Sequence, residues 1–290
     1  MGVMDYLPLI IIGAARSGTN ILRDTLTQVR GWETWPCDEI NAIWRHGNLD
    51  RESDVLGAGD ARPEVARFIR GAFDGMARRT AADVIVEKTC ANSLRLAFID
   101  SILPDARYLF IVRDGRDAAI SASKRWTASI EPLYLLRKLR YVPLRDVAHY
   151  SGRFIANRRY RIGSVDSRLK SWGPRFSGME DWITRFPLIE ICARQWAECV
   201  DEADRALAAI APERVARIRY EDFVSDPRGH LAGVEDLVGR PIVTELPPTA
   251  LDQIHATSVG SWRNQRSVLT KRAMQIMEPT LVRNRYDIAG

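Results

Sequence analysis

Cysteine and histidine are scarce in this sequence, and long apolar runs are missing. Four cysteines and four histidines occur among 290 residues. They form neither a CxxC pair nor a zinc-ligand spacing, so we expect no metal site. No stretch approaches the roughly 20 apolar residues of a membrane span. The N-terminal region has neither a basic leader nor the apolar core of a signal peptide. We therefore expect a reducing, cytoplasmic location and no membrane span.

The overall composition is typical of one globular domain. Hydrophobic residues make up 46 % of the chain and charged residues 27 %, both ordinary values. A length of 290 residues suits a single large domain with a sizeable core. The net charge of +5 suits an anionic ligand. Nucleic acid or an acidic membrane surface would suit it equally, so charge alone does not decide the partner.

Apolar segments and helical patterns alternate along the chain. Strand-like runs occur near residues 7–13, 83–88, 107–113 and 215–220. Helical patterns occur near residues 18–30, 63–80, 91–103 and 188–210. Strands that alternate with helices form a parallel sheet with helices on both faces. The sequence therefore predicts one α/β domain over residues 1–290, with a three-layer fold of the P-loop type.

A glycine-bounded turn follows the first predicted strand. The strand runs into Gly13, and a helix is predicted to begin after Gly18. The unpaired N–H groups and the dipole of such a helix start bind anions. An ordinary glycine turn between a core strand and a helix is the alternative interpretation. The residues expected to contact the anion are Gly13, Ala15, Arg16, Ser17, Gly18, Thr19 and Asn20.

This turn lacks the ligands that loops for nucleoside triphosphates use. Those loops carry Lys and then Ser or Thr directly after the second glycine, for the outer phosphates and for Mg²⁺. Here Thr19 and Asn20 follow Gly18, and the cation, Arg16, lies inside the turn. An unusual kinase or NTPase is therefore an alternative that would need Mg²⁺ and ATP for activity.

A second anion cradle is predicted about a hundred residues later. A strand ends there at Arg113, and open α/β sheets bind ligands at the carboxyl ends of their strands. Asp114 is a candidate N-cap, and Ser121 follows about two turns into the helix. The alternative is that Arg113 and Arg116 are solvated charges paired with Asp114 and Asp117. Two cradles on one sheet predict a ligand with two separate phosphate groups.

Together the two motifs resemble the sulfotransferase superfamily, whose donor is 3′-phosphoadenosine 5′-phosphosulfate (PAPS). The resemblance implies that the first turn grips the 5′-phosphosulfate. It also implies that Arg113 and Ser121, eight positions apart, grip the 3′-phosphate. Negative charge develops on the departing nucleotide during sulfonate transfer, and fixed cations stabilise it. Arg16 and Lys88 are the candidates for that role, and no metal is expected.

Three later segments resemble the same superfamily. The similarity runs from about residue 7 to 265, with a gap in the middle. Tyr220 is implied to approach the adenine of the donor. The segments are Glu87-Lys88-Thr89, Tyr220-Glu221-Asp222 and Gly260-Ser261-Trp262-Arg263-Asn264.

The chain also departs from the small-molecule members of that superfamily. Ile21 stands where those members have an aromatic residue that stacks on adenine. Residues 255–257 stand where they have a basic clamp on the 3′-phosphate, and Ser258 and Arg263 are candidates to replace it. Cys90 follows the Lys-Thr pair, where the small-molecule members place a catalytic His. The last departure favours the branch whose general base is a carboxylate.

Glu39 is the predicted general base. The acceptor hydroxyl must lose its proton, so a positioned base is needed. Carbohydrate and protein-tyrosine members place a Glu some twenty to thirty residues after the loop cation, and Glu39 follows that cation by 23 positions. Asp38 and His46 are rivals, and pairing of Glu39 with Arg45 on the surface is the structural alternative. Glu87 is expected to fix Lys88 by ion pairing or loop contacts.

Residues 127–187 mix arginines with aromatic side chains and lack a clean period. We interpret them as an acceptor-binding insertion or lid, and a basic, solvated excursion is the alternative. Interleaved arginines and aromatics also fit single-stranded nucleic acid, but no RNA-binding motif occurs, so no nucleic-acid partner is expected. The predicted function is sulfonate transfer from PAPS to an acceptor hydroxyl, of a sugar or a phenol rather than a small lipid alcohol. A non-catalytic binder of anionic ligands is the remaining alternative, and the oligomeric state stays open.

Overall fold

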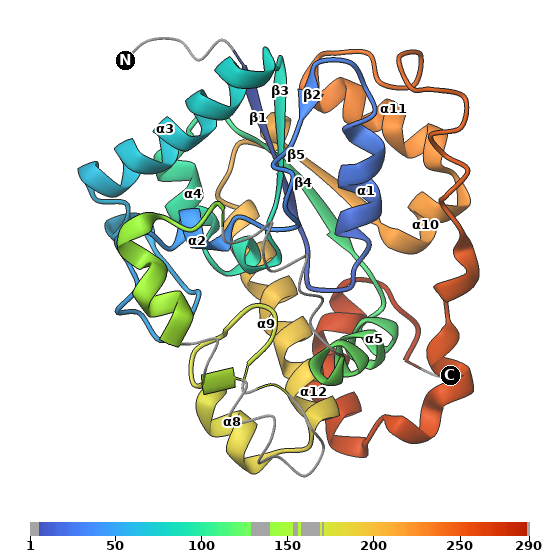
Figure 1. The fold of residues 1–290 in the computed structure, drawn as a ribbon. Coiled ribbons are helices and arrows are strands. Elements are labelled where there is room, and N and C mark those ends of the chain that lie inside the picture. The colour runs from blue at the N-terminus through green and yellow to red at the C-terminus, as the bar shows by residue number, and fades with distance from the viewer. Residues whose placement is uncertain (1–5, 129–139, 153–155, 158–168, 170, 289–290) are drawn as a thin grey trace.

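The computed structural model describes residues 6–128, 140–152, 156–157, 169 and 171–288. Its centre is a parallel sheet of five strands in the order β2-β3-β1-β4-β5, shown in Figure 1. The sheet confirms the predicted α/β class. The strands are β1 (Leu7–Ile12), β2 (Trp32–Glu33), β3 (Val84–Lys88), β4 (Arg107–Val112) and β5 (Val215–Arg219).

Helices cover both faces of this sheet (Figure 1). They are α1 (Thr19–Leu26), α2 (Asn41–Trp44), α3 (Pro63–Thr80), α4 (Leu96–Ile102), α5 (Gly115–Thr127), α8 (Met179–Arg185), α9 (Leu188–Leu207), α10 (Tyr220–Ser225), α11 (Pro227–Val238) and α12 (Lys271–Arg283).

The central strand β1 divides the hydrophobic core into two layers. Ile10 and Ile12 belong to the cluster formed with α3, α4, α5, α9 and α12. Leu9 and Ile11 belong to the cluster formed with α1, α10 and α11. Successive side chains of a strand point to opposite faces, and these four are fully buried. A strand that is buried on both faces has a continuous run of apolar residues in its sequence. For this reason β1 could be predicted from the sequence.

The four predicted strands and the helix predicted over residues 63–80 match the structure closely. The helix predicted over residues 18–30 ends at Leu26, and α2, α8, α10, α11 and α12 were not predicted. The edge strand β2 was not predicted, because two residues give no periodic signal. The helix predicted over residues 91–103 is divided: a 3₁₀ turn covers Cys90–Leu94, and α4 begins at Leu96. This break turns the chain directly after β3, and it places the residues that follow Lys88 at the edge of the sheet where the strands end.

Much of the predicted insertion at residues 127–187 lies outside the described residues. Its last described part is tied to the fold by α9 and by the loop that carries Asp54. Gln195 Nε2 donates to the carbonyls of Trp172 at 2.9 Å and Pro174 at 2.7 Å. The backbone N–H of Arg175 donates to Asp54 at 2.8 Å. Across the part of the chain that the structure describes, no helix is long and apolar enough to cross a bilayer.

Candidate active site

The predicted phosphate loop, which is the turn from Gly13 to Gly18, connects β1 to α1 and depends on two glycines. Gly18 precedes α1 with φ +88°, and a Cβ there would lie 2.3 Å from the ring of Tyr220. A Cβ at Gly13 would lie 2.8 Å from the carbonyl oxygen of Ile111 on β4. Only glycine permits these close approaches. The loop is therefore packed directly against β4 and against the residue that follows β5.

Arg16 joins the two predicted cradles. Its Nε donates to Ser121 Oγ on α5 at 2.9 Å, although the two residues are 105 positions apart in the sequence. Its carbonyl oxygen accepts from Arg113 Nη1 at 3.1 Å. The structure thus brings together the loop cation and both residues predicted for the 3′-phosphate. Burial lowers the pKa of Arg16, and the neighbouring Arg125 and Arg113 lower it further.

Arg113 is covered by Tyr220 and Ser258. Its Nη2 donates to the carbonyl of Ser258 at 2.7 Å, and its guanidinium lies 4.6 Å from the centroid of the Tyr220 ring. The Tyr220 hydroxyl is 2.9 Å from Ser258 Oγ. Arg113 is only 7 % exposed, so the alternative of a solvated charge is wrong for this residue. A buried guanidinium at the carboxyl end of a strand is suited to bind an anion.

The neighbouring charges on α5 are also buried. Arg116 pairs with Asp114 at 2.8 Å, and Asp114 caps the helix by accepting from the N–H of Arg116. The predicted pairing of Arg116 with Asp114 is therefore present, but both side chains lie in the protein interior. Asp117 lies 3.8 Å from Arg113.

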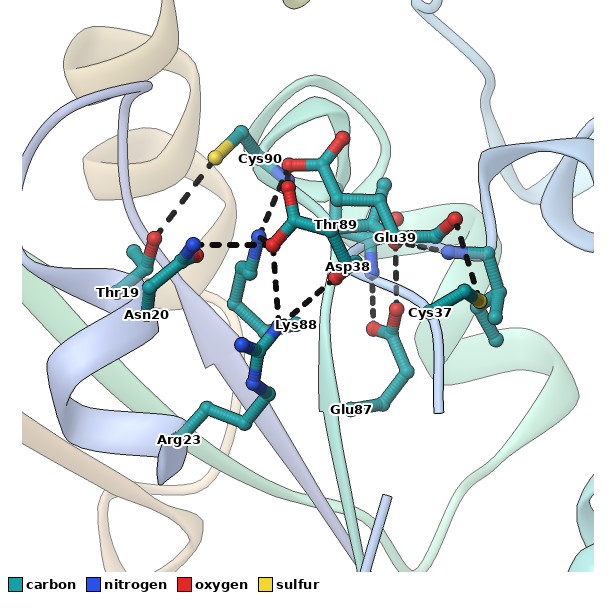
Figure 2. A network of polar contacts seen from close by, with 12 residues as sticks. Thr19, Asn20, Arg23, Cys37, Asp38, Glu39, Glu87, Lys88, Thr89 and Cys90 are labelled. Carbon is teal, nitrogen blue, oxygen red and sulfur yellow. Dashed lines mark hydrogen bonds and ion pairs between the residues drawn. The ribbon is translucent and has the colours of Figure 1, made fainter. Parts of the chain in front are cut away.

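Lys88 at the end of β3 is held by two carboxylates, as Figure 2 shows. Its Nζ donates to Asp38 Oδ1 at 3.0 Å and to Glu39 Oε1 at 3.2 Å. Its side chain is 2 % exposed. Burial alone would lower the pKa of Lys88, but the charges of Glu39 and Asp38 outweigh burial and raise the pKa above its usual value. Lys88 is therefore a fixed cation throughout the physiological range.

The two carboxylates of this turn differ in their surroundings. Asp38 Oδ1 accepts from Asn20, Arg23 and Lys88 at 3.0, 3.1 and 3.0 Å. Burial raises the pKa of Asp38, but Lys88 and Arg23 together lower it to about 2. Glu39 Oε1 accepts from Lys88 and from the backbone N–H of Cys90 at 3.2 Å. A carboxylate held by three charged or amide side chains is a weak base.

Glu87 faces away from Lys88 and organises the loop after β3 (Figure 2). It accepts from the Thr89 hydroxyl and from Asn92 Nδ2, both at 2.6 Å. Thr89 Oγ1 in turn accepts from the N–H of Ile40 at 3.2 Å. Of the two predicted roles, the structure shows the loop contacts. Burial raises the pKa of Glu87 to about 7, against the hydrogen bond from Thr89.

The remaining candidates for a base have other partners. His46 Nδ1 lies 2.8 Å from Asp146, and its ring stacks on Phe68. Arg45, the alternative partner of Glu39, is fully buried and pairs with Asp54 at 2.9 Å. Glu39 therefore faces Lys88 rather than Arg45.

Cys90 follows the Lys-Thr pair, where the resemblance implies a catalytic His in the small-molecule members, but its thiol is not suited to act as a base. Its Sγ lies 3.8 Å from Thr19 Oγ1 in the phosphate loop. Burial raises the pKa of the Cys90 thiol well above its usual value, and the charge of Glu39 raises it further. The thiol is neutral at physiological pH and cannot serve as a base. Among the described residues, no group of His, Cys, Asp and Glu side chains could hold a metal ion.

Two features of the site were not assigned from the sequence. The contact between Arg16 and Ser121 joins segments that no local pattern relates. Asp117 accepts hydrogen bonds from Gly260, Ser261 and Trp262, whereas the sequence offered it only as a partner for arginine. The only feature of the sequence that pointed to a role for Asp117 was its position one helical turn after Arg113.

Comparison with known proteins identifies the family and the fold. A model of a sulfotransferase family matches residues 8–159 and 151–245. The fold is similar to a sulfotransferase domain from the curacin biosynthetic pathway, with 14 % identity, a TM-score of 0.54, and 97 % of this chain and 99 % of that one covered. It is also similar to the sulfotransferase domain of the Synechococcus PCC 7002 olefin synthase, with 14 % identity, a TM-score of 0.53, and 99 % and 98 % covered. No curated protein sequence matches the chain.

Proposed function

The chain belongs to the sulfotransferase family, and we propose that it moves the sulfonate group of PAPS to an acceptor hydroxyl, with Glu39 as general base. The observation that carries the proposal is the direct contact between the two cradles. Arg16 of the phosphate loop reaches Ser121 of the second cradle at 2.9 Å. One ligand with two phosphate groups, such as PAPS, could then occupy both cradles at once.

Unsatisfied polar atoms support binding of such a ligand. Ser17 Oγ in the first cradle and Arg113 Nε in the second are buried and have no hydrogen-bond partner within the described ranges. Buried polar atoms without partners are costly, and an anionic ligand would supply partners at the predicted phosphate positions, although such atoms also occur elsewhere, as at Thr25 Oγ1 and Trp126 Nε1. In the proposed complex, Thr19, Asn20 and the N–H groups of Gly13, Ala15 and Gly18 hold the 5′-phosphosulfate beside Ser17. Arg113 and Ser121 hold the 3′-phosphate, and Tyr220 lies beside the adenine.

The transfer step uses the two cations and one carboxylate. The acceptor oxygen attacks sulfur in line with the bridging oxygen, a new S–O bond forms, and the old S–O bond breaks. Its electron pair remains on the 5′-phosphate of the departing nucleotide. Arg16 and Lys88 stabilise that negative charge, and the acceptor proton passes to Glu39. Lys88 acts through its charge, because its raised pKa keeps it protonated.

The choice of Glu39 over Asp38 rests on their partners. Asp38 accepts from Asn20, Arg23 and Lys88, and its pKa of about 2 makes it a poor proton acceptor. Glu39 lies on the same short turn and also contacts Lys88. In this proposal Asp38 holds Lys88 and Glu39 takes the proton. A carboxylate base goes with a sugar or phenol hydroxyl as the acceptor, rather than a small lipid alcohol.

Two measurements test the proposal. Calorimetry in EDTA compares binding of 3′-phosphoadenosine 5′-phosphate (PAP), AMP and ATP. Incubation with ³⁵S-labelled PAPS and a host-cell extract then identifies a labelled product. We expect PAP to bind far more tightly than AMP or ATP, and label to move to a hydroxyl compound. Equal binding of AMP would remove the argument for two phosphate sites, and a requirement for Mg²⁺ and ATP would indicate a kinase. Binding of PAPS without turnover on any acceptor would indicate a non-catalytic binder.

A further inference from the structure

Asp117 lies one helical turn after Arg113 on α5 and is almost fully buried, with 2 % of its surface exposed. Its carboxylate accepts three hydrogen bonds from a segment more than 140 positions away in the sequence. Oδ2 accepts from the N–H of Gly260 at 2.7 Å. Oδ1 accepts from Ser261 Oγ at 2.9 Å and from the N–H of Trp262 at 2.7 Å. Asp117 on α5 therefore holds the segment around residues 260–262 in place.

The anchored turn, residues 258–262, forms one side of the second cradle. Its first residue, Ser258, accepts from Arg113 through its carbonyl and contacts the Tyr220 hydroxyl through its own hydroxyl. Its last residue, Trp262, is buried under the guanidinium of Arg116, which lies 3.9 Å from the ring centroid. The turn is thus fixed at both ends, and its last three residues donate the three hydrogen bonds that Asp117 accepts.

The charge of Asp117 makes this arrangement informative. A buried carboxylate is costly unless hydrogen bonds and cations compensate for it. Here two N–H groups, one hydroxyl and Arg113, at 3.8 Å, provide the compensation. A negative charge beside an anion-binding arginine weakens the attraction for an anion. Its presence therefore points to a geometric role that outweighs the electrostatic cost.

We propose that Asp117 is a positioning residue for the 3′-phosphate. It holds the 258–262 turn against Arg113 and Tyr220, and the turn in turn fixes the Arg113 guanidinium through the Ser258 carbonyl. The inference rests on the proposed function, because it assumes that PAPS occupies this cradle. It adds that selectivity for a 3′-phosphate depends on a residue that does not touch the nucleotide.

The test compares the affinities of PAP and AMP for Asp117→Asn. The amide side chain can accept only through one atom, so at least one of the two N–H groups loses its partner. We expect the affinity for PAP to fall about tenfold or more, and that for AMP to change by less than about threefold. Asp236→Asn on α11 is the matched control, because Asp236 is exposed and the charge change is the same. This control should bind both nucleotides like the wild type.

The ratio of the two affinities separates positioning from a general structural role. Partial unfolding lowers the number of binding sites for PAP and AMP equally and leaves the ratio unchanged. If Asp117→Asn is not stable enough to measure, Ser261→Ala removes one of the three bonds without a change of charge. We expect this variant to lower the affinity for PAP about threefold and to spare AMP.

Two outcomes would overturn the inference. Unchanged selectivity in Asp117→Asn and in Ser261→Ala would show that the turn does not control the 3′-phosphate site. Tighter binding of PAP by Asp117→Asn would show that Asp117 acts through its charge alone. Both outcomes differ from failure of the proposed function, in which the wild-type protein itself would not prefer PAP over AMP.

Discussion

The edge of the sheet at which the strands end has two halves, and the positively charged side chains of these halves have different partners. Around β1, β4 and β5, the guanidinium groups of Arg16 and Arg113 donate to neutral oxygens: the Ser121 hydroxyl, the Ser258 carbonyl and the carbonyl of Arg16 itself. The Asp117 carboxylate lies farther off, 3.8 Å from Arg113, so two guanidinium groups face one carboxylate there. At the end of β3, Lys88 meets the carboxylates of Asp38 and Glu39. The first half keeps net positive charge for a ligand, and the second is already balanced by the protein.

Because of this difference, we expect the first half to bind the nucleotide and the second half to take part in the chemical step. Neutral oxygens can release a guanidinium to a phosphate at little electrostatic cost, so the first half is suited to anion affinity. Carboxylates hold Lys88 in place, and in the proposed mechanism one of them accepts the proton of the acceptor hydroxyl, so the second half would serve the chemical step. Substitutions in the first half should therefore change binding of the nucleotide, and substitutions in the second should change turnover.

The largest effect is expected for Glu39→Gln. The amide keeps the size of the side chain and can accept from the Cys90 N–H, but it cannot take a proton. Loss of a general base typically lowers the rate by about a hundred- to ten-thousand-fold, and the affinity for PAP should stay nearly unchanged. Steady-state kinetics with ³⁵S-labelled PAPS, with calorimetry of PAP, measures both quantities.

Asp38→Asn is the matched comparison for Glu39→Gln. It should lower turnover far less, because in the proposed mechanism Asp38 holds Lys88 and Glu39 takes the proton. An active Glu39→Gln enzyme beside an inactive Asp38→Asn enzyme would assign the base to Asp38. An inactive His46→Gln enzyme beside an active Glu39→Gln enzyme would assign it to His46.

The second effect concerns the other half of the edge. Arg113→Ala removes a buried charge-assisted contact, and PAP binding should weaken by about 2–4 kcal/mol. AMP, which has no 3′-phosphate, should lose much less affinity. Lys124→Ala removes an exposed cation from α5, the helix that follows Arg113, and serves as the control in calorimetry. Equal losses for Arg113→Ala and Lys124→Ala would show that the effect is only long-range attraction.

The third effect tests which contacts hold the half of the edge at the end of β3 in place. Thr89 is fully buried, donates to Glu87 and accepts from the N–H of Ile40. Thr89→Val leaves both partners unsatisfied and should lower the free energy of unfolding by about 1–3 kcal/mol. Thr89→Ser keeps the hydroxyl and should lose less, with only a methyl removed. Urea unfolding measures the free energy of unfolding of both variants. Equal losses of this free energy in Thr89→Val and Thr89→Ser would assign the effect to packing rather than to hydrogen bonding.

The last effect is a pH dependence from Glu87. Folded Glu87 keeps its proton up to pH about 7, whereas in the unfolded chain it ionises near its ordinary value of 4.5. Between these values a rise in pH removes the proton from the unfolded chain only, so stability falls as pH increases and levels off above about 7. Relative to Glu87→Gln, the wild type should lose about 1–3 kcal/mol between pH 5 and 8. Parallel stability curves for the two proteins would contradict the raised pKa.

The sequence predicted those parts of the fold and site that local patterns specify. The apolar run before Gly13 and the run that ends at Arg113 each predicted a buried strand, and both strands are present. The boundaries of α3, residues 63–80, were predicted to the residue, because Pro63 begins the helix and the apolar period is clean. The α/β class followed from this alternation of strands and helices.

The contacts that define the site could not be predicted in the same way. Arg16 reaches Ser121, and Asp117 reaches Gly260, across more than a hundred residues. Such contacts depend on the order of strands in the sheet, which places β1 between β3 and β4. The separate surroundings of Asp38 and Glu39 also follow from tertiary packing, since the two residues are adjacent in the chain.

Arg16 has a left-handed backbone, with φ of 71°, a conformation that costs an ordinary residue about 1 kcal/mol relative to glycine. A glycine at this position would relax the backbone and make the protein more stable, but it would also remove the cation that joins the two cradles. Thermostability and activity therefore oppose each other at residue 16. A selection for heat resistance alone would favour Arg16→Gly, and a selection for sulfonate transfer would reject it.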